Sequence, residues 1–278
     1  MKNVRSTFYI TAALGLWLMF SHFFSNETKS VMVMSDVISG ALIILFSLMR
    51  RPWAIAGVGV WLQLAPLFCW ASSSYSYITD TFIGVAAIAF AVIMPDEKDE
   101  GVGIPPGMNH NPSSWSRRIP IAFLALGAHL SARYMASYQL GYIDTIWDPV
   151  FDDGKGTWYV ITSKISDLFP CSDAGLGAFA YMLEVLLVLK GGTRRWHTMP
   201  WIVGFFGFLV VPVGIVSSVL IFLQPLVVGH WCFWCLLTAF FMLLMVILTI
   251  GEVIASWQFI TRSMKAGIPF KKVFWHGG

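Results

Sequence analysis

Apolar residues run along this chain in long, nearly unbroken stretches that short polar connections separate. A helix that crosses the hydrocarbon core of a bilayer needs about 20 consecutive apolar residues. Eight stretches reach or approach that length, at residues 8–24, 31–49, 54–71, 78–94, 119–138, 174–189, 200–226 and 231–250. The pattern predicts an all-α polytopic membrane protein with about eight transmembrane helices. Ser21-His22-Phe23-Phe24 offers no small-residue cleavage site, so we expect the first stretch to be a retained span.

The composition supports a membrane protein. Hydrophobic residues make up 57% of the 278 residues, charged residues make up 12%, and the mean hydropathy is +0.70. A single soluble core cannot bury that much apolar surface, so we expect contact with membrane lipid.

The basic residues predict the orientation of the helices. With an even number of spans, 14 of the 18 Lys and Arg residues fall on the side of the two termini, and the other four are Lys29, Arg133, Lys155 and Lys164. Cytoplasmic connections carry such an excess. We therefore expect a bacterial inner-membrane protein with both termini in the cytoplasm. The net charge of +3 then reflects topology and gives no support to nucleic-acid binding.

An internal repeat occupies the first half of the chain. A shift of 44 positions places Gly15 on Gly59, Trp17 on Trp61 and Gly40 on Gly84. Each copy is predicted to be a pair of helices, and the two copies are predicted to pack against each other through their glycines, which let transmembrane backbones approach closely. With Arg51-Pro52-Trp53 as a variant signature, residues 8–95 resemble the SPW repeat, a small membrane helical-hairpin family.

Asp36 and Asp80 occupy equivalent positions in the two copies. An acid inside a membrane is costly and is a functional candidate, for example in a proton path. The alternative is that each acid caps the N-terminus of its helix, beside Ser35 or Thr79. The sequence favours capping.

Polar segments divide the chain into four parts. Residues 1–95 form the predicted repeat domain, and residues 96–117, which begin with Asp96-Glu97-Lys98-Asp99-Glu100, form a predicted cytoplasmic linker. Residues 118–252 contain four further predicted helices. Residues 253–278 form a basic and aromatic cytoplasmic tail, which suits an anionic inner leaflet.

Cys232-Phe233-Trp234-Cys235 is the strongest chemical motif of the chain. Two thiols at this spacing on the first turn of a helix can close a disulfide, and the helix amides favour the thiolate of the first cysteine. The predicted topology places Cys69, Cys171, Cys232 and Cys235 toward the external, oxidising side. The alternatives are packing cysteines in a buried helix and a structural zinc site with His230. We predict no metal.

Residues 118–252 resemble the vitamin K epoxide reductase family. The landmarks are the loop that ends at Val160-Ile161-Thr162-Ser163, the turn from Asp173 to Tyr181 that enters the second helix, and the Cys-x-x-Cys that begins the fourth. The resemblance implies a four-helix bundle that holds a quinone, ubiquinone or menaquinone, beside the cysteine pair. It implies that Cys235 faces the quinone while Cys232 exchanges with an upstream thiol.

The resemblance also implies a quinone site. The family's quinone-binding asparagine falls on Asp173, and its quinone-binding tyrosine falls on Ala239. Tyr181 and Trp234 are further candidates for quinone contact, although tryptophans at a membrane interface are ordinary. Glu184, deeper in the second helix, either handles protons or pairs with a polar group such as His129.

The electron supply departs from the family pattern. Active members carry two cysteines in the external loop, whereas residues 141–170 contain none, and Pro149 and Thr157 occupy the aligned positions. Cys171, just before Asp173, could provide a shortened relay or be a small packing residue. The acids of this loop, from Asp144 to Asp153, are spaced only loosely like a calcium loop.

These features predict a membrane thiol–quinone oxidoreductase that takes electrons from an external, thioredoxin-like dithiol protein, with Cys232, Cys235 and Cys171 as its redox residues. The alternative is a non-catalytic assembly protein, or a quinone- or lipid-binding protein, that keeps a degenerate bundle.

Overall fold

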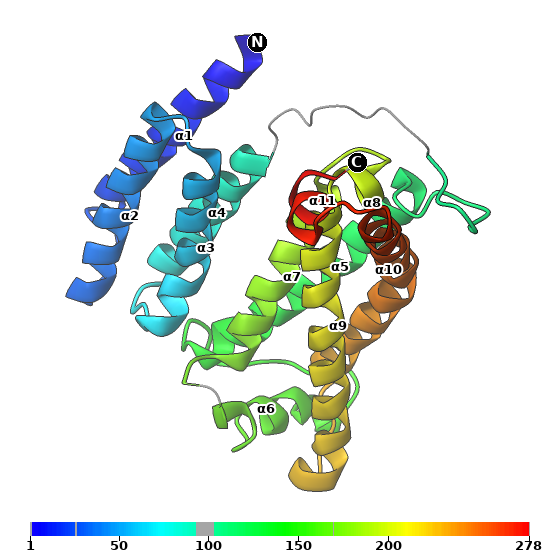
Figure 1. Cartoon of the computed structure of the whole chain (residues 1–278). Coiled ribbons are helices and arrows are strands. Elements are labelled where there is room, and N and C mark those ends of the chain that lie inside the picture. The colour runs from blue at the N-terminus through cyan, green and yellow to red at the C-terminus, as the bar shows by residue number, and fades with distance from the viewer. Residues whose placement is uncertain (1, 26, 93–102, 169, 278) are drawn as a thin grey trace. The chain divides into compact units, whose positions relative to one another are not determined.

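The computed structural model describes residues 2–25, 27–92, 103–168 and 170–277, and this part of the chain is helical without strands (Figure 1). The predicted charged linker segment at residues 96–100 lies outside the described residues. The elements are α1 Lys2–Ser21, α2 Ser30–Leu48, α3 Pro52–Phe68, α4 Ser74–Val92, α5 Trp115–Gln139, η1 Asp152–Gly154, α6 Gly156–Ile161, η2 Ser166–Leu168, α7 Asp173–Leu189, α8 Arg195–Thr198, α9 Pro200–Leu223, η3 Gln224–Val228, α10 Phe233–Lys265 and α11 Phe270–His276.

A long helix coincides with each of the eight predicted spans. Four of the described helices are long and apolar enough to cross a membrane, at Ser30–Leu48, Trp115–Gln139, Pro200–Val228 and Phe233–Lys265, and shorter apolar helices lie at Thr7–Ser21 and Pro52–Phe68. The all-α prediction is confirmed, and these helices fit a polytopic membrane protein.

The chain forms two compact units. Unit 1 comprises Met1–Met94, Tyr134–Ile146 and Ile161–Phe179, and unit 2 comprises Pro95–Arg133, Trp147–Val160 and Ala180–Gly278. Helices α5 and α7 therefore contribute one end to each unit. The predicted domain boundaries stay a prediction.

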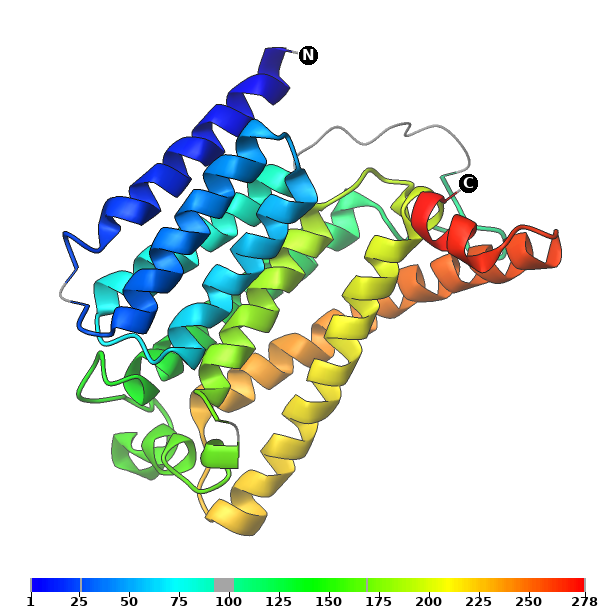
Figure 2. The ribbon, with the colours of Figure 1, turned by 60° about the vertical axis from the view of Figure 1, so that its left-hand side comes forward.

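Unit 1 is built on the repeat. Helices α1 and α2 lie side by side, as do α3 and α4 (Figures 1 and 2). A Cβ at Gly15 would lie 2.7 Å from the carbonyl oxygen of Gly40, and a Cβ at Gly59 would lie 2.8 Å from that of Gly84. Each copy is thus a helix pair, as predicted, but these glycines bring together the two helices within a copy, so the prediction that they pack one copy against the other was wrong.

The two copies also touch each other at equivalent residues. Ser72 lies 44 residues after Thr28, and its Oγ is 3.0 Å from both the backbone nitrogen and the Oγ1 of Thr28. Contact between equivalent residues is what a two-fold relation between two copies produces. The repeat is therefore visible in the packing of unit 1 as well as in the sequence.

Asp36 and Asp80 lie inside their helices and do not cap them. Helix α2 begins at Ser30 with Lys29 as its N-cap, and α4 begins at Ser74, so each acid is nearly two turns from the start. Both side chains are buried, and the two carboxyl groups are close enough to interact. The capping interpretation was wrong, because an N-cap precedes the first helical residue, whereas each acid follows the first residue of its helix by six positions.

Unit 2 contains most of α5 together with the second half of α7, α9 and α10. Two buried arginines tie these helices together at one end: Arg118 donates to the carbonyl oxygens of Val188, Lys190, Gly191 and Gly192, and Arg195 donates to those of Leu187, Val188 and Lys190. Both side chains satisfy carbonyls at the C-terminal end of α7 and complement its dipole.

The predicted tail is helical. Helix α10 continues to Lys265, beyond the predicted span end at Ile250, and α11 follows it. Aromatic side chains of α11 pack on α9, where Phe274 contacts Phe205 and Trp275 contacts Trp201. The aromatic residues of this segment therefore have partners within unit 2.

Candidate functional site

The cysteine pair lies at the start of α10. Cys232 is the N-cap residue and is joined to Cys235 by a disulfide, with a Cα–Cα distance of 5.3 Å. The backbone N–H of Cys235 donates to Sγ of Cys232, with the nitrogen 3.1 Å from the sulfur. This is the first-turn geometry that the sequence predicts, and a thiolate at Cys232 would receive the same amide.

The two sulfurs differ in access. The Cys232 side chain is 0% exposed, whereas Cys235 is half-buried. The backbone nitrogen of Cys232 lies 3.0 Å from Oε1 of Gln224, in the π-helical turn η3 that ends α9. Gln224 thereby fixes the chain just before α10 and keeps the backbone of Cys232 away from solvent.

One carboxylate holds the loop between α5 and α6 against this helix start. Oδ2 of Asp148 accepts from the backbone nitrogen of Phe233 at 2.9 Å, and from the backbone nitrogen and Oγ1 of Thr157 at 2.9 and 2.7 Å. Its Oδ1 accepts from the backbone nitrogens of Val150 and Phe151. Burial alone would raise the pKa of Asp148, but these hydrogen bonds outweigh it and hold the pKa below its ordinary value.

An aromatic pair and a charged pair add to the contact between the loop and the start of α10. The indole N–H of Trp234 donates to the carbonyl oxygen of Trp147 at 2.8 Å. His230 stacks on Tyr159, and its Nδ1 lies 3.0 Å from a carboxylate oxygen of Asp152. No group of three or more metal-ligating His, Cys, Asp or Glu side chains occurs in the described ranges. The indole N–H of Trp234 is thus already used to hold the loop. The predicted contact of Trp234 with a quinone stays a prediction.

The other predicted redox and quinone residues near the loop end belong to unit 1. Cys171 is a buried free thiol in an apolar cluster with Leu67 and Tyr77. Burial, and then the Asp173 carboxylate, raise the pKa of Cys171. Asp173 is the first residue of α7, and its Oδ1 accepts from Nε2 of Gln139 at 2.6 Å.

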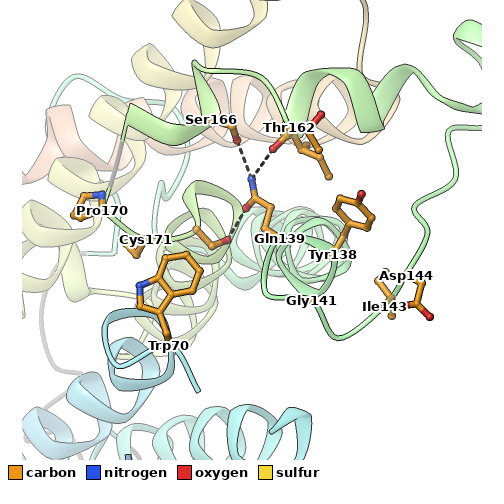
Figure 3. A pocket seen from close by; sticks show the side chains of 12 residues that line it. Trp70, Tyr138, Gln139, Gly141, Ile143, Asp144, Thr162, Ser166, Pro170 and Cys171 are labelled. Atoms are coloured by element: carbon orange, nitrogen blue, oxygen red, sulfur yellow. Dashed lines mark hydrogen bonds between the residues drawn. The ribbon is translucent and has the colours of Figure 1, made fainter. Parts of the chain in front are cut away.

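A cavity of about 650 Å³ adjoins Cys171 within unit 1 (Figure 3). The rings of Trp70 and Tyr138 contribute to its walls, and the amide of Gln139 is its main polar group. Figure 3 shows this amide reaching Ser166, and its Oε1 also accepts from Ser172. The cavity could hold a small apolar ring, although the cysteine pair belongs to unit 2.

Inside unit 2, α7 carries two buried polar residues. The hydroxyl of Tyr181 hydrogen-bonds Ser217 and Thr238, and Oγ1 of Thr238 donates to the carbonyl oxygen of Cys235. Glu184 is 0% exposed, and neither of its carboxyl oxygens has a hydrogen-bond partner among the described residues. The predicted pairing of Glu184 with a neighbour such as His129 was therefore wrong.

Sequence reasoning missed Asp148, Gln139 and Gln224. In the sequence Asp148 is one of several acids in its loop, and Thr157 stands out only as a residue at an aligned cysteine position. A buried acid followed nine residues later by threonine carries little signal by itself, since Phe233 becomes a partner only through the fold.

Comparison with known proteins supports the interpretation of the second half. Residues 119–250 match the model of the Vitamin K epoxide reductase family, close to the predicted limits of 118–252. No curated protein and no solved structure matches the chain. The chain thus contains a vitamin K epoxide reductase family domain over these residues, while the SPW resemblance of residues 8–95 stays a prediction.

Proposed function

We propose that this protein is a membrane thiol–quinone oxidoreductase of the vitamin K epoxide reductase type. The observation that supports this best is the Cys232–Cys235 disulfide at the start of α10, within the segment that matches the family model. A dithiol pair in this place can exchange two electrons with a partner on the external side and with a ligand in the bundle.

In the proposed exchange, a partner dithiol is oxidised and the Cys232–Cys235 disulfide is reduced, so two electrons pass from one pair to the other. A thiolate of the partner attacks Sγ of Cys232, the Cys232–Cys235 bond breaks, and Cys235 leaves as a thiolate. The partner's second thiol then attacks the mixed disulfide, so the partner becomes oxidised while Cys232 and Cys235 become reduced. A bound quinone would supply the acceptor for the two electrons and two protons released when the pair closes again.

Two buried polar side chains of unit 2 are candidates for contact with such a ligand. Tyr181 offers a hydroxyl, and Glu184 is a buried carboxyl with both oxygens orphaned within the described structure. Buried polar groups normally have partners, so an orphaned carboxyl on the helix that also carries Tyr181 points to a ligand or a proton. Tyr181 and Glu184 would hold the quinone from α7, and Thr238 links Tyr181 to Cys235 on α10. Ala239 offers no polar group at the family's tyrosine position.

The electron donor is a separate dithiol protein of thioredoxin-like chemistry. Residues 141–170 contain no cysteine that could act as a relay. Cys171 is the candidate for a shortened relay, but its burial and raised pKa make its thiolate scarce. These properties favour direct exchange between the partner and the Cys232–Cys235 pair. The topology completes the proposal, with both termini cytoplasmic and the pair on the periplasmic side.

Thiol trapping of the purified protein in lipid nanodiscs tests the function. After reduction and removal of reductant, addition of ubiquinone or menaquinone should restore the disulfide, measured as loss of modification by maleimide-PEG. Cys235→Ala is the blank, and a Cys69→Ser/Cys171→Ser background removes other thiols. A reduced pair that neither quinone reoxidises faster than buffer alone would refute the proposal.

A second candidate function is a non-catalytic membrane assembly or lipid-binding role. The complete burial of Cys232 and the absence of loop cysteines favour it, because both restrict electron supply. It predicts a disulfide that a thioredoxin-like dithiol cannot reduce in the folded protein. Reduction of the pair by such a donor at a rate above that of the unfolded control would exclude this role.

A further inference from the structure

We infer that Asp148 is a positioning residue for the redox pair: its carboxylate latches the external segment 147–160 over Cys232 and opposes negative charge on the Cys232 sulfur. This inference rests on the proposed function, because it gives the latch a role in thiol exchange.

The latch is a single buried side chain that joins three parts of unit 2. Asp148 is 2% exposed, and its two oxygens accept five hydrogen bonds. Two come from its own turn, two come from Thr157 at the start of α6, and one comes from Phe233. Phe233 lies between the two cysteines, so displacement of Asp148 would free the loop and the first turn of α10 together.

The backbone of the loop approaches the residue before the pair very closely. A Cβ at Gly156 would collide with the carbonyl oxygen of Trp231. The Trp147–Trp234 hydrogen bond and the Asp152–His230 pair lie on either side of this contact. A partner thiolate must reach Sγ of Cys232 in line with the disulfide, and because Cys232 is 0% exposed the residues around it must first move. The segment held on Trp231 and Phe233 contacts the residues on both sides of Cys232 in the chain, so its release is the movement that we infer.

The charge of Asp148 has a separate effect. The N-terminus of a 33-residue helix favours a thiolate at Cys232, and the amide of Cys235 already points at that sulfur. The Asp148 carboxylate occupies the neighbouring amide of Phe233, where its negative charge disfavours the thiolate. Removing the charge should therefore stabilise the reduced pair relative to the disulfide.

Two substitutions distinguish the contact from the charge. Thr157→Val keeps the charge and removes one hydrogen bond. Thr157→Ser retains that bond and is the rescue variant. Asp148→Asn removes the charge and, because one accepting oxygen becomes an NH2 group, also loses at least two of the five hydrogen bonds, so the effect of Thr157→Val shows how much of its result comes from the contact. Asp153→Asn is the matched charge control, because Asp153 is an exposed acid on the same segment with φ of 51°, a conformation that asparagine tolerates.

Two readouts are measured on the full chain in nanodiscs. The first is the alkylation rate of Cys232 against pH, with Cys69, Cys171 and Cys235 replaced by serine. The second is the equilibrium of the intact pair with a glutathione buffer. Asp148→Asn should lower the pH midpoint of alkylation by roughly one unit and shift the redox equilibrium up to roughly tenfold toward the dithiol.

Thr157→Val should raise the alkylation rate about fivefold at an unchanged pH midpoint, because one ordinary hydrogen bond no longer holds the segment closed. Asp153→Asn and Thr157→Ser should match the wild type. Wild-type values in both Asp148→Asn and Thr157→Val would overturn the inference, as would equal effects of Asp153→Asn and Asp148→Asn. If Asp148→Asn does not fold, the alkylation rate of Cys232 in Thr157→Val decides whether the inference holds. Neither readout uses quinone, so a failure of quinone-driven oxidation would refute the proposed function without affecting these results.

Discussion

Arg195 and Glu252 form a two-pronged ion pair inside unit 2. Nε of Arg195 lies 2.7 Å from Oε1 of Glu252, and its second terminal nitrogen lies 2.6 Å from Oε2. The side chains are 0% and 2% exposed, and Ser113 Oγ also donates to Oε1. Since Arg195 binds carbonyls near the end of α7 as well, this pair connects α10 to α7.

Breaking this pair should cost substantial stability. Arg195→Ala and Glu252→Ala each leave one buried charge without its partner, which costs about 3–5 kcal/mol. We expect each variant to melt well below the wild type in detergent, and the double variant to lose much less than the sum of the two. Exposed Lys265→Ala is the control and should melt like the wild type. Additive losses would show that the two residues act independently.

The close contact between α3 and α4 at Gly59 can be tested with a single methyl group. Gly59→Ala would place a methyl group against the carbonyl oxygen of Gly84, whereas a Cβ at Gly57 on the same helix meets nothing within 4 Å among the described atoms. Gly59→Ala should therefore destabilise the protein by about 1–3 kcal/mol, and Gly57→Ala should be neutral or slightly stabilising. The melting temperatures of the two variants, measured by thermal unfolding, check this difference in stability. Equal melting temperatures would contradict the close packing of α3 and α4.

Local and periodic features of this protein were predictable from the sequence. Apolar length placed the helices, the 44-residue shift identified the two helix pairs, and spacing placed the cysteines on the first turn of α10. The glycine contacts were predicted between the two copies, whereas they lie within each copy. The start of α4 was less accurate, because Ser74 begins a helix whose apolar pattern starts only at Ile78. The caps at Asp36 and Asp80 were wrong for another reason, since both acids already lie inside the apolar stretches that predict their helices.

Contacts between distant polar residues were not predictable. In the sequence Arg118 and Arg195 are simply basic residues near helix ends, yet both are buried on carbonyls at the end of α7 or just after it, up to 74 residues away from Arg118. The sequence shows a charge but not the carbonyl oxygens that the fold brings to it. The same holds for Asp148, whose amide partner at Phe233 is 85 residues away.

The pH dependence of the latch follows from the lowered pKa of Asp148. Because the pKa is lower in the folded protein than in the unfolded chain, the stabilisation is present above the ordinary carboxyl pKa of about 3.9 and is lost as the pH falls through the folded value. The stability difference between wild type and Asp148→Asn should thus stay constant from about pH 7 to about pH 5 and shrink only at more acidic pH. Thermal melts across this range measure it. A difference that disappears near neutral pH would contradict the assignment of the shift to Asp148.

Replacement by glutamine should affect stability differently at the two buried glutamates of unit 2, Glu252 and Glu184. Glu252→Gln removes the charge that Arg195 needs and should lower the melting temperature. Glu184→Gln removes a carboxyl that no described side chain or backbone group hydrogen-bonds, so stability should be unchanged or slightly higher. If Glu184 exchanges a proton with a bound quinone, Glu184→Gln should nevertheless slow quinone-driven reoxidation of the Cys232–Cys235 pair by roughly a hundredfold.

The rate of quinone-driven reoxidation in Glu184→Gln must be compared with the rate of a reaction that involves no quinone. Reduction of the disulfide by a soluble dithiol should be the same in Glu184→Gln and the wild type, because this step takes place at Cys232. Glu184→Asp keeps a titratable group one methylene shorter and should recover part of the quinone rate. If Glu184→Gln instead lowers both rates together, or melts like Glu252→Gln, then Glu184 supports the packing of the bundle and has no part in proton exchange.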